Sequence, residues 1–376
     1  MKKYFNFLIA FALFLSFSAQ GQTNFEFKLV KNSAATSVKN QASSSTCWSY
    51  SSLSFFESEL LRLGKPELDL SEMYVVRMSY IEKAKLYVKM HGSVNFSAGG
   101  ALQDAFNVMD KYGLVPQEAY AGLNYGTTSN DHSELDAVLK AYIDVVIKSE
   151  KPTSAWINGF IALLDSYLGK CPEKFTYKGK EYTPRTFADG VVALKSSDYM
   201  YFSSYTHHPF YEQFIMEVPD NWSWGKVVNL PINEMLSVMK AAVNNNYTIA
   251  WASDVSEKGF SSANAVALVP SKDLSYTSRD DVKNYLSQPI EEQNITQEMR
   301  QLAFENYETT DDHGMHIVGL ATDKAQNEYF YVKNSWGEST GAKGYFYASD
   351  NFVAYKTMSF MLHKDAVPAE ILKKLK

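Results

Sequence analysis

Cys47 is the residue of this chain whose position most clearly indicates chemistry. It follows a polar run, residues 40–46, and precedes a stretch in which apolar residues recur at three- and four-residue spacing. That spacing predicts a helix with Cys47 in its first turn and the Ser and Thr residues of the run as its N-cap. Free N–H groups at a helix start favour a thiolate over a thiol, whose free pKa is about 8.5. We therefore predict a nucleophile rather than a structural cysteine.

A nucleophilic thiol needs a base and a group that orients the base. Candidates lie far along the chain, in residues 312–319 (DHGMHIVG) and 334–337 (NSWG). A cysteine with a distant His and Asn is a known pattern of thiol catalysis. His316 lies three residues after His313, so on a strand it faces the opposite side and is expected to be a packed or surface imidazole. The same alternation disfavours a metal site formed by the two.

His207 and His208 form a second chemical pair. Adjacent rings on a strand point to opposite faces, so they do not readily share a ligand. We expect ordinary polar surface there, and no metal site anywhere in the chain.

The elements that must position these residues are helical in the first part of the chain. The helix that starts at Cys47 should end at Gly64-Lys65-Pro66, and Ser71 should cap a second helix that runs to about Met90. Gly99-Gly100 predicts a tight turn before a third helix, which lies at 101–112. The remaining predicted helices lie at 134–147, 154–168, 233–244 and 294–308, with a hairpin at 177–180.

Short runs rich in β-branched and aromatic residues predict strands in the last third of the chain. They lie at 247–252, 316–321, 329–333, 344–348 and 357–363, and an extended segment precedes Cys47 at 25–38. A helical half followed by a mostly antiparallel half predicts an α+β fold with a cleft between two lobes.

Composition excludes several classes of protein. The 376 residues are 45% hydrophobic and 14% aromatic, which is enough for a large core. The formal charge of −6 argues against nucleic acid as a partner. With two cysteines, Cys47 and Cys171, a disulfide scaffold is excluded, although pairing of these two stays open.

The N-terminus predicts export. Lys2-Lys3 precedes an apolar run, residues 4–17, and then small residues, so residues 1–21 read as a signal peptide cleaved after Gly21. The run is too short to span a bilayer, and we expect no membrane span in the mature chain. The predicted location is periplasmic or secreted.

Four features together resemble the papain-like cysteine peptidases: Gln41 six residues before Cys47, Cys-Trp opening a helix, a His beginning a strand that ends in Val-Gly, and Asn-Ser-Trp-Gly. The resemblance implies Cys47 as nucleophile, His313 as base and then acid, and Asn334 as the group that orients the imidazole. Gln41 and the Cys47 backbone N–H would form the oxyanion hole. Trp336 would shield the His–Asn hydrogen bond from water.

Further motifs resemble the bleomycin hydrolase and aminopeptidase C branch of that superfamily. They are STCWSY at 45–50, LSEMY at 70–74, IEKA at 81–84, DKYGLVP at 110–116, NLPI at 229–232, ASDV at 252–255 and VPAEIL at 367–372. By this resemblance the backbone of Gly99 and Gly100 would pair with an extended substrate, although a plain loop turn fits the sequence equally well. In the branch a C-terminal arm blocks one end of the cleft and limits cleavage to N-terminal residues. Here that arm looks short, and the branch is typically cytoplasmic.

The predicted organisation has five parts. Residues 1–21 are the signal peptide, 22–125 the N-terminal segment and helical lobe, 126–225 a family-variable insertion, 226–363 the β-rich lobe, and 364–376 a short tail.

The predicted function is that of an exported cysteine peptidase without cofactor or metal, acting on peptides, with aminopeptidase action preferred. The alternatives are an endopeptidase, an amidase or transpeptidase on the same fold, or a catalytically silent binding protein. Homo-oligomer formation stays open.

Overall fold

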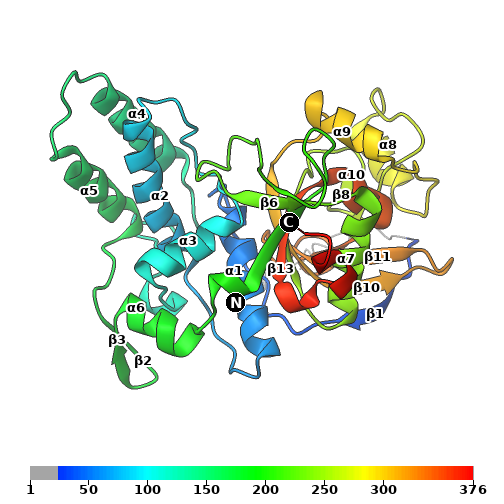
Figure 1. Cartoon of the computed structure of the whole chain (residues 1–376), viewed down its shortest axis with the longest axis horizontal. Helices are drawn as coiled ribbons and strands as arrows, with labels where there is room; N and C mark the ends of the chain where they lie inside the picture. Colours follow the sequence, from blue (N-terminus) through cyan, green and yellow to red (C-terminus); the bar gives the residue numbers. More distant parts are fainter. Residues whose placement is uncertain (1–23, 376) are drawn as a thin grey trace, which may run out of the picture.

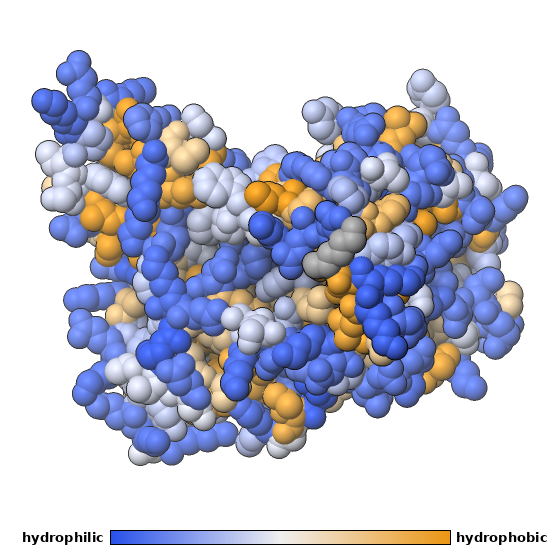
Figure 2. Space-filling view, viewed as in Figure 1, coloured by the Kyte–Doolittle hydropathy of each residue, from blue (hydrophilic) through white to orange (hydrophobic). Residues whose placement is uncertain are grey.

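The molecule has two lobes, one helical and one built on a large sheet (Figure 1). The computed structural model describes residues 24–375, so the predicted signal peptide lies outside the described residues. The predicted α+β class, helical first and mostly antiparallel afterwards, is confirmed. Figure 2 shows that the surface is indented between the outer ends of the two lobes. None of the helices within residues 24–375 is long and apolar enough to cross a membrane.

The helical lobe follows the predicted elements closely, except that the four-residue helix Pro184–Phe187 was not predicted. Its elements are α1 (Cys47–Arg62), α2 (Glu72–Lys89), α3 (Gln103–Tyr112), α4 (Ser133–Ile147), α5 (Trp156–Leu168), the hairpin β2 (Phe175–Tyr177) and β3 (Lys180–Tyr182), and α6 (Pro184–Phe187). Short turns lie at Gln117–Ala119, Ala188–Val192 and Ser196–Asp198. Ser71 caps α2 as predicted, because its side chain accepts a hydrogen bond from the Tyr74 N–H.

The predicted side-chain cap of α1 is wrong. Thr46 occupies the N-cap position but makes no side-chain hydrogen bond to the helix. Its hydroxyl lies 2.6 Å from the Ser44 hydroxyl, and both residues are fully buried. Because these two hydroxyls pair with each other, the first N–H groups of α1 are not capped by the polar run.

The main sheet has the order β5-β6-β4-β13-β7-β10-β11-β12-β9-β8, with β1 paired to β10. Most pairings are antiparallel; β4 with β6 and β9 with β12 are parallel. The strands are β1 (Lys28–Asn32), β4 (Tyr199–Ser203), β5 (Gln213–Ile215), β6 (Lys226–Asn229), β7 (Ile249–Ser253), β8 (Phe260–Ser261), β9 (Val266–Ala267), β10 (His313–Thr322), β11 (Glu328–Lys333), β12 (Tyr345–Ser349) and β13 (Thr357–His363). Since β4 and β5 belong to this sheet, part of the segment 126–225 lies in the β lobe.

Five helices and one short turn accompany the sheet. They are α7 (Ile232–Asn244), α8 (Arg279–Tyr285), α9 (Gln297–Glu305), α10 (Asp350–Lys356), the turn Lys364–Ala366, and α11 (Ala369–Leu372). Sequence reasoning missed α8, α10 and α11, which have 7, 7 and 4 residues, because they are too short to show a helical period.

The two lobes meet where α1 packs against β10. A Cβ atom added to Gly314 would lie 3.1 Å from the Cα atom of Trp48 and 2.7 Å from the hydroxyl of Ser51. Only a glycine lets the start of the strand approach the start of the helix so closely. The first residue of α1, Cys47, and the first residue of β10, His313, therefore lie on the two sides of one joint.

Candidate active site

A cleft of about 850 Å³ opens at this joint. It is lined by most of the residues that the sequence singled out, and its lining includes Gln41, Cys47, Trp48, Gly99, Gly100, His313 and Trp336. Asn334 lies behind His313 and is bonded to it. The fold thus brings together residues from four separate segments of the chain, 41–48, 99–100, 313 and 334–336.

His313 and Asn334 form a short hydrogen bond. The Nε2 atom of His313 lies 2.7 Å from the Oδ1 atom of Asn334. The same Oδ1 atom accepts the Ser335 backbone N–H at 2.8 Å, which fixes the oxygen end of the amide toward both donors. His313 must therefore carry its hydrogen on Nε2, which leaves Nδ1 as the basic nitrogen.

Cys47 accepts hydrogen bonds from the backbone N–H groups of Gly314 and Trp48. These bonds lower the pKa of the thiol, but burial has the larger effect and raises it to about 12. Burial also lowers the pKa of His313 to about 4, although the hydrogen bond that its Nε2 donates to Asn334 acts to raise it. An isolated thiolate or imidazolium is thus disfavoured here, and each charge needs the other beside it.

Gln41 is held by the residue that follows Asn334. Its Oε1 atom accepts a hydrogen bond from the Ser335 hydroxyl at 2.6 Å, and its backbone N–H donates to the Ser335 carbonyl at 2.8 Å. The bond to Oε1 leaves the amide nitrogen as the end that can donate into the cleft. Sequence reasoning missed this role of Ser335, although the residue lies within the Asn-Ser-Trp-Gly motif.

Trp336 covers the imidazole. Its ring lies 4.6 Å from the ring of His313, centroid to centroid, at an interplanar angle of 30°. His316 lies on the other side of β10, buried beneath α1, where its Nδ1 atom is 2.9 Å from the Ser54 hydroxyl. The sequence left open whether residue 316 is a packed or a surface imidazole, and the structure shows that it is packed.

Gly99 and Gly100 form the wall of the cleft on the helical lobe. A Cβ atom at Gly99 would lie 1.8 Å from a carboxylate oxygen of Asp220, and one at Gly100 would lie 2.8 Å from the Trp48 ring. The buried ammonium group of Lys83 donates to the carbonyls of Ser97, at 2.9 Å, and of Gly99. Sequence reasoning missed this role of Lys83, although the residue lies within the IEKA motif at 81–84.

The cleft is acidic near the thiol. Asp220, Asp311 and Asp312 line it, and the charges of Asp220 and Asp311 act to raise the pKa of Cys47. Burial raises the pKa of Asp311 to about 7, and the charges of Asp220 and Asp312 add to this rise. These carboxylates come from two segments that are far apart in the sequence, so their spacing along the chain could not have predicted that they line one cleft.

The structure also tests what the sequence predicted for the two cysteines and for the pair His207 and His208. Cys47 and Cys171 are both free thiols, so the disulfide that the sequence left open is not formed. The expectation that His207 and His208 do not readily share a partner, because adjacent strand residues face opposite sides, is wrong. They lie in a turn between β4 and β5, and both Nε2 atoms contact one carboxylate, that of Glu217.

Comparison with known proteins places the chain among peptidases. The model of the Peptidase C1-like family matches residues 11–376. Aminopeptidase C of Streptococcus thermophilus is 23% identical over 387 residues, covering 89% of this chain and 82% of that protein. Aminopeptidase W of Lactobacillus delbrueckii subsp. lactis is 25% identical over 379 residues, covering 90% and 83%.

A crystal structure of pepw from Lactobacillus rhamnosis superposes with a TM-score of 0.71 at 20% identity. The match covers 92% of this chain and 84% of that one, which confirms the predicted two-lobed papain-like fold. With the family model spanning nearly the whole sequence and the fold in agreement, the chain belongs to the Peptidase C1-like family of cysteine peptidases.

Proposed function

We propose that this protein is an exported cysteine aminopeptidase that cleaves peptide bonds through Cys47, His313 and Asn334. The observation that carries the proposal is the bond between His313 Nε2 and Asn334 Oδ1, in a cleft that Cys47 and Gln41 also line. It leaves Nδ1 of His313 as a base in the cleft that holds the thiol.

In the proposed reaction the Cys47 sulfur attacks the substrate carbonyl carbon while His313 Nδ1 takes the thiol proton. The carbonyl oxygen becomes an oxyanion, which the Gln41 amide and the Cys47 backbone N–H stabilise. The imidazolium then donates its proton to the leaving amine, the C–N bond breaks, and a thioester remains. Water, losing a proton to His313, hydrolyses the thioester and releases the acid product.

The pairing of charges explains why neither group acts alone. Burial disfavours a lone thiolate and a lone imidazolium. The proposed proton transfer therefore requires that each charge stabilise the other.

Two observations favour aminopeptidase over endopeptidase action. The relatives named above are aminopeptidases, and the carboxyl groups of Asp220 and Asp311 line the cleft, where a substrate's free α-ammonium group would pair with their negative charge and favour the ionised form. The C-terminal tail does not supply that charge: within residues 24–375, the cleft lining includes no residue after Ser359. Ile371 instead packs into the core of the β lobe.

The test compares one fluorogenic peptide with a free and with an acetylated N-terminus. We expect cleavage of the free form only, and Asp311→Asn should raise its KM by about tenfold with little change in kcat. Equal cleavage of both forms would favour an endopeptidase. The variant Cys47→Ala should abolish either activity, and activity that survives it would exclude the thiol mechanism.

Export is supported by Lys2-Lys3 and the apolar run after them. N-terminal sequencing of the protein recovered from outside the cytoplasm should give a chain that begins at Gln22. A cytoplasmic chain that retains residues 1–21 would contradict the proposal.

A further inference from the structure

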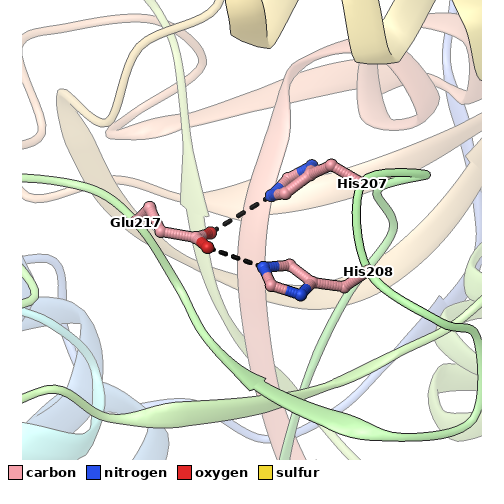
Figure 3. A group of neighbouring side chains, drawn as sticks. All are labelled: His207, His208 and Glu217. Carbon is pink, nitrogen blue, oxygen red and sulfur yellow. Dashed lines mark hydrogen bonds and ion pairs between the residues drawn. The ribbon is translucent and has the colours of Figure 1, made fainter.

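A second cluster of reactive side chains lies outside the catalytic centre. His207 and His208 stand in the turn between β4 and β5, and Glu217 follows β5 (Figure 3). The Nε2 atom of His207 lies 3.1 Å from one carboxylate oxygen of Glu217, and that of His208 lies 2.6 Å from the other. One ligand atom from each of the three residues lies within 4.8 Å of the others.

Packing holds both rings in this arrangement. His208 stacks on Phe214 with 4.5 Å between ring centroids, and His207 stacks on Phe304 of α9 at 5.5 Å and 8°. The fully buried Asn229 fixes the turn itself, because its side-chain amide donates to the carbonyls of Tyr205 and His208 at 2.7 and 2.8 Å. The turn is therefore a built feature of the fold and not a loose surface loop.

We propose that His207, His208 and Glu217 bind one divalent transition-metal ion of the zinc class. Two imidazole nitrogens and one carboxylate are ligands that Zn²⁺ accepts at about 2.0–2.2 Å, with a fourth position for water. His207 and Glu217 are exposed, so solvent can reach that position. The sequence predicted no metal because it treated the two histidines as strand residues, whereas a turn lets both rings face the same side.

The hydrogens at the site can be accounted for. Without metal, the side-chain amide of Gln301 donates to Nδ1 of His207 at 2.9 Å, so the ring hydrogen is on Nε2 and is donated to Glu217. Metal binding needs the Nε2 lone pair, so this hydrogen moves to Nδ1. The Gln301 amide then turns so that its oxygen accepts the Nδ1 hydrogen. This turn breaks two other bonds of the amide: the Thr206 N–H donates to its oxygen at 2.6 Å, and its nitrogen donates to Glu305 at 2.8 Å. Thr206 and Glu305 are both exposed, so each bonds water instead.

The site is connected to the catalytic cleft through Glu217. Its two neighbours, Met216 and Val218, both line the cleft. An ion bound by Glu217 and the turn would therefore fix this wall of the cleft relative to the sheet. Bound metal should thus change substrate affinity more than the chemical step.

The first experiment measures Zn²⁺ binding to the full chain by titration calorimetry. All variants carry Cys47→Ala, because the thiol and His313 would otherwise compete for the metal. We expect one ion per chain, and at least tenfold weaker binding in His208→Ala and in Glu217→Gln. The exposed His91 gives the control, since His91→Ala should bind as tightly as its parent. Absence of binding, or binding that both cluster variants retain, would overturn the proposal.

The second experiment uses Co²⁺ as a spectroscopic probe in the same proteins. A site with two imidazoles, one carboxylate and water should give the intense visible absorption of four-coordinate cobalt, and Glu217→Gln should remove it. The spectrum of the fully hydrated ion in the parent protein would reject the site. Neither readout depends on peptidase activity, so failure of the proposed function would leave this test intact.

Discussion

His313 and His316 lie three residues apart on β10, and both are almost fully buried, at 5% and 1% exposure. His313 lies on the cleft side and is bonded to Asn334. His316 faces α1 and contacts Ser54, whose hydroxyl also accepts a hydrogen bond from the Lys333 ammonium at 2.8 Å. Asn334 and Lys333 are consecutive residues, so each side of the sheet carries one histidine and one partner.

Burial has the same effect on the pKa of the two imidazoles, but their partners have opposite effects. Burial lowers the pKa of both, but the bond to Asn334 raises that of His313, whereas the Lys333 charge lowers that of His316 further. A histidine beside an ammonium group is kept neutral and cannot accept a proton during a reaction. The partner of each imidazole, and not its burial, therefore separates the proposed base from the packing residue.

The largest expected effect comes from removing the base. His313→Ala should lower kcat/KM by about 1,000-fold or more, because no other group takes the thiol proton. Alkylation of Cys47 by iodoacetamide provides a second measurement. Without the imidazole the thiol keeps a pKa raised toward 12, so its alkylation rate should rise about tenfold per pH unit from pH 6 to 9. A rate that is flat with pH would show that Cys47 ionises without His313.

Loss of the oxyanion donor should have the next largest effect. Gln41→Ala should lower kcat by about 100- to 1,000-fold with a small change in KM, because the amide acts on charge that develops only in the transition state. Ser335→Ala, which frees the Gln41 amide to rotate, should have a smaller effect in the same direction. Equal values of kcat for wild type and Gln41→Ala would remove Gln41 from the proposed mechanism.

Asn334→Ala should lower kcat by about 10- to 100-fold, because His313 would lose the acceptor that selects its tautomer. The matched change on the other side of the sheet is Ser54→Ala, which removes the hydroxyl partner of His316. It should leave kcat/KM within about threefold of wild type. If both variants lost activity equally, the distinction between the two histidines would fail.

The smallest effect on activity is expected for His316→Gln, which should act on stability instead. Because the pKa of His316 is lowered on folding, the unfolded chain binds a proton that the folded chain does not as the pH falls below about 6.5. The free energy of unfolding of the wild type should therefore fall between pH 7 and 5, and less steeply in the variant. Urea denaturation at the two pH values measures this difference, and identical slopes would contradict the assignment.

Much of the helical lobe and the catalytic motifs could be predicted from the sequence. The helices have regular apolar spacing, and His313 and Asn334 lie in motifs that can be matched by order along the chain. The predicted cap by the Ser/Thr run was wrong because the pairing of Thr46 with Ser44 depends on burial, which spacing does not reveal. The roles of Lys83 and Asp220 depend on contacts between distant segments.

The turn at His207 and His208 shows a different limit. Period-two alternation is reliable only where the backbone is extended, and here the chain turns between two short strands. Nothing in the local sequence identifies Glu217, ten residues further on, as the group that both rings contact.

The packing of α1 against β10 has a consequence for how the enzyme should lose activity. The proposed nucleophile, Cys47, belongs to one lobe and the proposed base, His313, to the other, so slight separation of the lobes in mild denaturant would move the two apart while every helix and strand stayed intact. Turnover should therefore vanish at lower urea concentration than the circular dichroism signal, making catalysis a sensitive gauge of lobe docking.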